Sequence, residues 1–98
     1  MRAALAMTVK ITQMDDFKGK IVLRIEGKLL SDDADLLEQT FEALETSKGV
    51  EIDMSGITFI DSDSASVIKR LEQKGAALSG VDFFIRTVIE TQKKTKQE

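Results

Sequence analysis

Carboxylates and hydroxyls are concentrated in one short stretch of the chain, Asp61-Ser62-Asp63-Ser64. This stretch follows the apolar run Ile57-Thr-Phe-Ile60 and precedes apolar residues at helical spacing. In α/β proteins, ligands, phosphates and partners often bind where a strand ends in polar residues and a helix begins. The stretch could supply carboxylates for acid/base chemistry or metal binding and hydroxyls for phosphorylation. It is therefore our candidate functional site.

The composition excludes much of the remaining chemistry. The 98 residues contain no histidine, cysteine, tryptophan, tyrosine or proline. Histidine-based acid/base catalysis, thiol nucleophiles, disulfides and the usual zinc sites are therefore excluded. The length and an apolar content of 42% predict one domain with a modest core.

Two interpretations of the stretch as a metal site or an active site fit poorly. Asp61, Asp63 and Glu72 fall at positions 1, 3 and 12 of an EF-hand calcium loop. Ala65 and Ser66, however, stand where that loop needs a ligand and a glycine. Asp61 and Asp63 also resemble the Asp-x-Asp pair of haloacid-dehalogenase phosphatases. Those enzymes need a lysine, further acids and a larger domain, and the 35 residues after Asp63 leave no room for them, so a small Asp-dependent phosphatase is a remote alternative.

A structural role is expected in any case. Asp61 or Ser62 would cap the N-terminus of the following helix, a contribution of about 0.5–2 kcal/mol. Asp63 would lie at the positive end of the helix dipole. Neither role excludes a second one.

Apolar periodicity predicts the elements that position this stretch. Alternating apolar residues predict strands at about 8–14 and 19–26, joined as an antiparallel hairpin, with Gly27 closing the second strand. A helix is then expected at about 32–47, with Ser31 as its N-cap. Its apolar positions are Leu36, Leu37, Phe41 and Leu44.

The second half of the chain predicts two more strands and two more helices. The expected elements are a strand over 50–60, a helix over about 62–74, a short strand over 76–79 and a helix started by Asp82. The inward residues expected are Ala65, Val67, Ile68 and Leu71 in the second helix, and Phe84, Ile85, Val88 and Ile89 in the third.

The order β-β-α-β-α-β-α predicts an α/β fold with a small mixed four-stranded sheet and about three helices that cover chiefly one face. We expect one domain over residues 8–94. Residues 1–7 are expected to form an N-terminal extension and residues 95–98 a C-terminal tail. Nothing in the sequence resembles a signal peptide or a membrane span, so a cytoplasmic location is the default expectation.

Charge is uneven along the chain. The stretch from Ser31 to Asp63 contains ten acidic residues and one basic residue, Lys48, while the net charge of the chain is −3. Such a stretch argues against nucleic acid as a partner and favours a partner with a basic surface. The alternative is a solvated helix face.

The stretch Asp53-Met-Ser-Gly-Ile-Thr-Phe-Ile-Asp-Ser-Asp-Ser64 resembles the signature of the STAS family. This family includes bacterial anti-sigma-factor antagonists and the tails of sulfate transporters. Gly27, Gly75 and Gly80-Val81 extend the similarity over most of the chain. The resemblance implies a non-enzymatic protein-interaction module in signal transduction and transcription regulation, without a cofactor or a metal.

The chain departs from the family pattern at the residue that carries the switch. In antagonists of this family a partner kinase phosphorylates the second serine of Asp-Ser-Ser-Gly, and here Asp63 occupies that position. Ser64 replaces the glycine, and Gly27-Lys28-Leu29-Leu30 replaces the frequent Gly-Glu-Leu-Asp. The resemblance therefore implies a module that is not regulated by phosphorylation at the usual serine, with Ser62 and Ser64 as alternative acceptors.

The partner implied by the resemblance is a basic anti-sigma factor or a serine-kinase-like regulatory protein. A STAS module of a transport complex or of a sensory assembly stays open as an alternative, as does a homo-oligomer. The partner surface is expected at the end of the sheet and comprises Asp61, Ser62, Asp63, Ser64, Leu29, Leu30 and Ile57.

Overall fold

The computed structural model describes residues 9–15, 18–44 and 49–95. Its elements, in order, are β1 (Val9–Asp15), β2 (Ile21–Leu29), α2 (Ser31–Ala43), β3 (Val50–Ile60), α3 (Ser62–Gln73), β4 (Ala77–Ser79) and α4 (Phe83–Thr95). This order confirms the predicted mixed α/β fold. The expected extension at residues 1–7 and residues 96–98 of the expected tail lie outside the described residues, and Thr95 belongs to α4.

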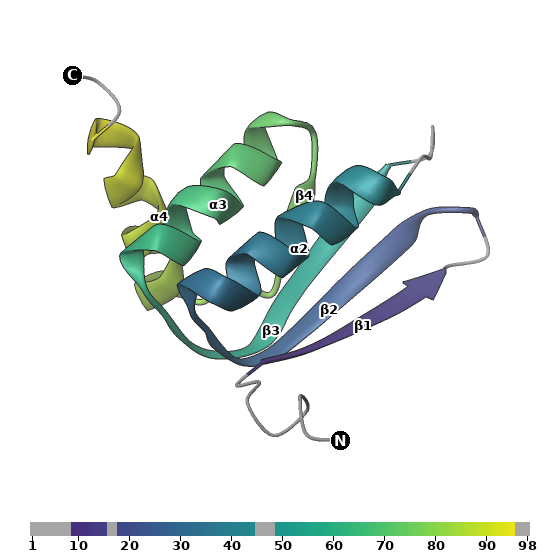
Figure 1. The fold of residues 1–98 in the computed structure, drawn as a ribbon, viewed down its shortest axis with the longest axis horizontal. Coiled ribbons are helices and arrows are strands. Elements are labelled where there is room, and N and C mark those ends of the chain that lie inside the picture. Colours follow the sequence, from purple (N-terminus) through teal and green to yellow (C-terminus); the bar gives the residue numbers. More distant parts are fainter. Residues whose placement is uncertain (1–8, 16–17, 45–48, 96–98) are drawn as a thin grey trace.

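The four strands form one sheet in the order β1-β2-β3-β4. β1 is antiparallel to β2, whereas β2, β3 and β4 run parallel to one another. In Figure 1, α2 and α3 lie side by side over one face of the sheet, and α4 lies beside α3. Because β2 and β3 are parallel neighbours, both end at the same edge of the sheet, where α2 and α3 begin.

β2 is longer than the sequence predicted. Gly27 does not close the strand, which continues to Leu29. Gly27 has a φ of 104°, in the left-handed region, and the register between β2 and β3 shifts there. Leu29 then pairs with Ile60, and both side chains are buried. Burial of these two residues explains why the pairing continues past the glycine.

The first helix also differs from its predicted boundaries. α2 begins at Ser31, and its N-cap is Leu30, which makes no side-chain capping hydrogen bond. The prediction of Ser31 as the N-cap was therefore wrong. The helix ends at Ala43, and the predicted last residues, 45–47, lie outside the described part of the chain.

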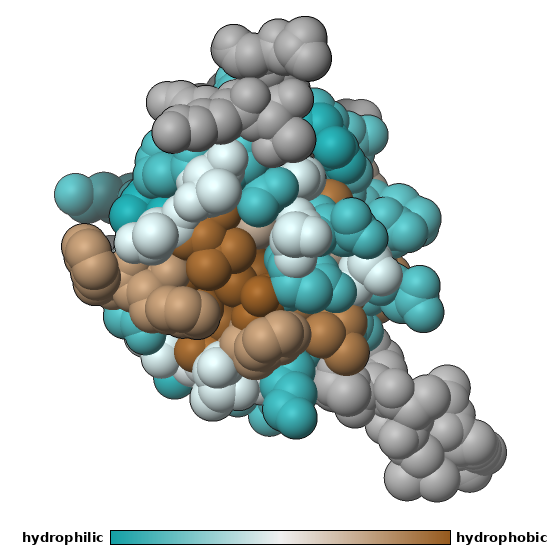
Figure 2. All heavy atoms as spheres, turned by 90° about the vertical axis from the view of Figure 1, so that its left-hand side faces the viewer, coloured by the Kyte–Doolittle hydropathy of each residue, from teal (hydrophilic) through white to brown (hydrophobic). Residues whose placement is uncertain are grey.

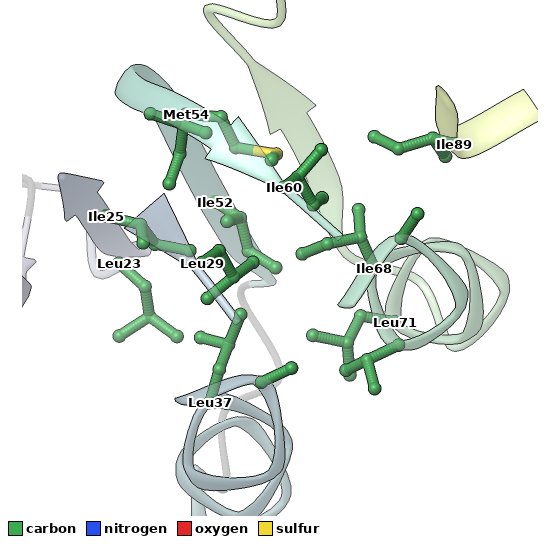
Figure 3. Packing of buried hydrophobic residues seen from close by; sticks show 14 of the residues in the cluster. Leu23, Ile25, Leu29, Leu37, Ile52, Met54, Ile60, Ile68, Leu71 and Ile89 are labelled. Atoms are coloured by element: carbon green, nitrogen blue, oxygen red, sulfur yellow. The ribbon is translucent and has the colours of Figure 1, made fainter. Parts of the chain in front are cut away.

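The core lies between the sheet and the helices, and Figure 3 shows its packing. Side chains of α2 and α3 point toward those of β2 and β3, and Ile89 of α4 lies beyond Ile60. All four inward residues predicted for α3 are buried. The prediction of Phe84 as an inward residue of α4 was wrong, because its side chain is 63% exposed. The residues labelled in Figure 3 are Leu23, Ile25, Leu29, Leu37, Ile52, Met54, Ile60, Ile68, Leu71 and Ile89.

None of the helices in the described ranges is both long enough and apolar enough to cross a membrane.

Candidate functional site

Asp61 joins β3 to α3 and caps the helix. Its carboxylate oxygen Oδ1 accepts a hydrogen bond of 2.8 Å from the backbone N–H of Ser64, and its backbone carbonyl accepts one of 2.9 Å from Ala65. Of the two capping residues that the sequence allowed, the structure selects Asp61, and Ser62 is the first residue of the helix. The carboxylate satisfies a backbone donor that would otherwise lack a partner inside the helix.

The same side chain also closes the N-terminus of α2. Asp61 Oδ2 accepts a hydrogen bond of 3.1 Å from the backbone N–H of Ser31, and the backbone N–H of Asp61 donates to Leu29 O at 3.3 Å. This contact explains why α2 begins after Leu30 without a polar side chain of its own at the cap. The carboxylate of Asp61 thus links the starts of two neighbouring helices, and its backbone N–H ties them to the end of β2.

The environment of Asp61 favours its charged form. Burial raises the pKa of this carboxyl, but the hydrogen bonds donated by Ser64 and Ser31 outweigh burial and hold the pKa below its usual value. Both helices direct the positive ends of their dipoles at this point. A fixed carboxylate therefore already occupies the place where two helix N-termini would otherwise attract a phosphate.

The four residues of the Asp61–Ser64 stretch differ in accessibility. Ser62 and Asp63 are exposed, and Asp61 is half-buried. Ser64 is fully buried, and its hydroxyl lies by the carboxylate of Asp61. A kinase could therefore reach the hydroxyl of Ser62, but it could reach Ser64 only if the start of α3 opened.

The apolar residues predicted for the partner surface lie mostly in the core. Leu29 is fully buried, and Ile57 is only 7% exposed. Leu30, by contrast, is half-buried. Leu29 and Ile57 therefore support the surface from below, because a partner could not contact them without a rearrangement of the core.

The acidic stretch from Ser31 to Asp63 does not form one face. On the helical side, Glu38 of α2 binds Arg70 of α3, with its Oε1 2.7 Å from Nη2, and Glu42 forms an ion pair with Lys74. The bonds from Arg70 lower the pKa of Glu38, although burial opposes them, and the same contact raises the pKa of Arg70. These two acidic groups are therefore balanced within the molecule, whereas Asp32 and Asp35 of α2 are exposed.

Two further acids of the stretch lie on β3. The side chain of Glu51 is 2.9 Å from Lys20 Nζ, and hydrogen bonds from Ser79 and then Lys20 lower its pKa. Asp53 accepts hydrogen bonds from the backbone and side chain of Ser55, which lower its pKa. These groups, too, are engaged by their own chain, whereas Asp63 is exposed at the start of α3.

The carboxylate of Asp61 is committed to the two helix starts. Both oxygens of Asp61 accept hydrogen bonds from helix N–H groups. Within residues 9–15, 18–44 and 49–95, no group of three or more acidic side chains is placed to hold a metal ion.

Comparisons with known proteins agree with this architecture. The family model of the STAS domain matches residues 8–95. Among solved structures, the chain is similar to an antisigma-factor antagonist STAS domain from Rhodobacter sphaeroides, with a TM-score of 0.58 and 22% sequence identity. That match covers 74% of this chain and 87% of the other, and at this identity it supports the fold alone. A search of the curated proteins found no match.

Proposed function

Because the chain belongs to the STAS domain family, we propose that it is a non-enzymatic protein-interaction module of the anti-sigma-factor-antagonist type. The observation that carries this proposal is the exposed carboxylate of Asp63 in the first turn of α3. It lies beside the exposed Ser62, at the sheet edge where β2 and β3 end. A partner would meet a fixed negative charge on a rigid helix start.

The module works without a phosphorylation switch at the residue that the family uses. A phosphoserine carries about −1.5 to −2 charges and three acceptor oxygens, whereas a carboxylate carries −1 and two. Asp63 therefore imitates the phosphorylated state only weakly, and it cannot be switched. Ser64 is buried, so Ser62 is the accessible hydroxyl of the Asp61–Ser64 stretch.

The partner is an anti-sigma factor or a serine-kinase-like regulatory protein with a basic contact surface. Negative charge at Asp63 steers such a surface to the site, and Leu30 adds apolar contact at the start of α2. Glu38, Glu42 and Glu51 contribute less to this steering because basic residues of the same chain already pair with them.

The proposal is tested by co-purification from source cells with the tagged full chain. Wild type is expected to retain an anti-sigma factor or a kinase-like regulator, and Asp63→Lys is expected to lose it. Asp15→Lys is the matched control, since Asp15 is exposed at the far end of β1 and carries the same charge change. Equal recovery by all three proteins would show that Asp63 is not at the interface.

Phosphorylation is tested separately with the kinase recovered in that experiment. We expect no stoichiometric phosphate on the chain after incubation with ATP, as measured by intact-mass spectrometry. Full modification of Ser62 would contradict the unswitched module and would show that the exposed hydroxyl replaces the usual acceptor.

A further inference from the structure

Three phenylalanines expose large apolar side chains near the end of the sheet that carries the candidate site. Phe83 and Phe84, in the first turn of α4, are 85% and 63% exposed, and Phe59, near the carboxyl end of β3, is 43% exposed. Figure 2 faces the end of the molecule where α4 and the starts of α2 and α3 lie, and it shows apolar side chains gathered across the middle of that face. We call Phe59, Phe83 and Phe84 the aromatic surface.

The packing of α4 against the core is made by residues other than these exposed phenylalanines. α4 docks on α3 and the sheet through Ile85 and Ile89, which are 3% and 0% exposed. Its position is further fixed by an ion pair of 3.4 Å between Lys69 of α3 and Glu90 of α4. Phe83 and Phe84 stay largely exposed beside this contact. Clustered apolar side chains that remain in water at one face mark an interaction surface.

Charges beside the aromatic surface indicate the chemistry of its occupant. Asp61 and Asp63 follow Phe59 in the chain, and Asp82 precedes Phe83, so carboxylates flank the rings from two elements. Asp82 is exposed and also caps α4, since its Oδ1 accepts a hydrogen bond of 2.8 Å from the backbone N–H of Ile85.

The nearby bases do not cancel this negative charge. Arg86 of α4 is held by Glu90 at 3.0 Å and by Glu72 at 3.5 Å. Lys28 lies opposite Phe59 in the register of β2 and β3 and is the basic residue next to that ring in the sheet. Asp63 and Asp82 are therefore the two exposed carboxylates beside the rings, and Asp61 adds a half-buried one.

This charge distribution disfavours two other occupants. A second copy of the chain would bring the same carboxylates face to face, because a two-fold interface joins a surface to itself. Nucleic acids and anionic membranes would be repelled by the same groups. An apolar segment flanked by cationic side chains is complementary to both the rings and the carboxylates.

We propose that the aromatic surface binds an amphipathic segment of another protein, which places apolar side chains on Phe59, Phe83 and Phe84 and lysine or arginine side chains against the flanking carboxylates. This inference rests on the proposed function, because it names the kind of partner segment that the interaction module takes. The aromatic surface would supply most of the affinity, and the carboxylates would supply orientation and selectivity.

The probes are two synthetic amphipathic helices that share one leucine face and differ only in a lysine-rich or a glutamate-rich polar face. Binding to the full chain is followed by fluorescence anisotropy, and the site is mapped by NMR shifts. The variant is the double change Phe83→Ser with Phe84→Ser. The control is Met14→Ser. Met14 is 41% exposed, but it lies on β1 opposite Val22, near the start of β2 and away from the candidate site.

We expect the lysine-rich helix to bind at least tenfold more tightly than the glutamate-rich helix, with shifts at the three phenylalanines. The double variant should lose at least tenfold in affinity, and Met14→Ser should bind as wild type does. Equal binding of both helices, or shifts confined to other faces, would overturn the proposal. So would a dimer of the free protein that sedimentation velocity detects and that the double variant abolishes.

The failure of this inference can be told apart from failure of the proposed function. If Asp63→Lys releases the regulatory partner from the full chain and the phenylalanine variant does not, the proposed function stands and the aromatic surface is not its docking site. If the lysine-rich helix binds as expected and no anti-sigma factor or kinase-like protein is recovered, the aromatic surface stands and the assignment of the partner is wrong.

Discussion

At the scale of single residues, Asp61 has a structural role, because it caps the helix whose first turn carries the exposed Asp63. The carboxylate of Asp61 accepts hydrogen bonds from the backbone N–H groups of Ser64 and Ser31, so both helix starts depend on it. We expect Asp61→Asn to lower the free energy of unfolding by about 1–2 kcal/mol at neutral pH, because an amide oxygen replaces only part of this bonding and carries no charge. Urea unfolding measures the loss.

The pH dependence of this loss identifies the charged form as the stabilising one. The pKa of Asp61 is lowered in the folded protein from an ordinary value of 3.8, so its contribution is complete above that value and disappears as the pH falls through the folded pKa. The gap between wild type and Asp61→Asn should therefore narrow in acid. Asp63→Asn is the control, since Asp63 is exposed, and a gap that stays constant with pH would refute the role of the charge.

Ser64 provides a second test at this scale. Its buried hydroxyl lies by the carboxylate of Asp61 and helps to lower the pKa of that group. Ser64→Ala should therefore lower the free energy of unfolding by about 1 kcal/mol, whereas the exposed Ser62→Ala should change it by less than about 0.5 kcal/mol. A gain of stability in Ser64→Ala, measured by urea unfolding, would show that the hydroxyl is buried without a useful partner.

Sequence patterns predicted part of this site. The capping role of Asp61 follows from its place before an apolar helical stripe, and that local rule was confirmed. The bond from Ser31 to Asp61 joins residues 30 positions apart, and no local pattern reports such a contact. For the same reason Ser31 was predicted to be a cap, although the acceptor for its helix comes from another element.

At the scale of elements, the turn that leads from β4 to α4 depends on Gly80. Its φ is 66°, and a Cβ built there would lie 2.7 Å from Ser55 Cβ and 2.8 Å from Ser55 N, on the neighbouring strand β3. The backbone of a central strand cannot move aside cheaply. Gly80 therefore lets the turn before α4 pass close to β3.

Gly80→Ala should therefore destabilise the protein more than Gly75→Ala does. Gly75, after α3, has a φ of 107° but nothing within 4 Å of its Cβ position, so alanine there suffers only conformational strain of about 1–2 kcal/mol. At Gly80 the steric clash adds about 1–3 kcal/mol. Thermal and urea midpoints of the two variants provide the comparison, and equal midpoints would contradict the close approach.

Element boundaries show where tertiary contacts override local signals. Gly27 predicted the end of β2, but the strand runs on to Leu29 because the pairing of Leu29 with Ile60 buries both side chains. Phe84 was predicted to point inward with Ile85, yet the two residues are neighbours on a helix, and only one of them faces α3. Period and composition alone did not distinguish a core aromatic from an exposed one.

At the scale of the whole molecule, the acidic stretch separates into charges paired within the chain and exposed charges, among them Asp63, that a partner could contact. Glu38, Glu42 and Glu51 pair with basic residues of α3, of its C-cap or of the segment before β2. Asp63 is exposed at the sheet edge that carries both helix starts. The sequence predicted the excess of acid but not this division, because the pairing residues lie outside the acidic stretch.

This division predicts that two charge reversals of equal size will differ in their effect on binding. Asp63→Lys and Glu51→Lys both change the net charge by the same amount. Glu51→Lys loses the contact of 2.9 Å with Lys20, and Asp63→Lys places a cation at a helix N-terminus, so each should cost less than about 1 kcal/mol of stability. With the partner recovered by co-purification, only Asp63→Lys should weaken binding, by at least about tenfold. If both variants weaken binding to the same extent, as measured by titration calorimetry, the partner responds to the total charge of the molecule and the exposed carboxylate has no special place.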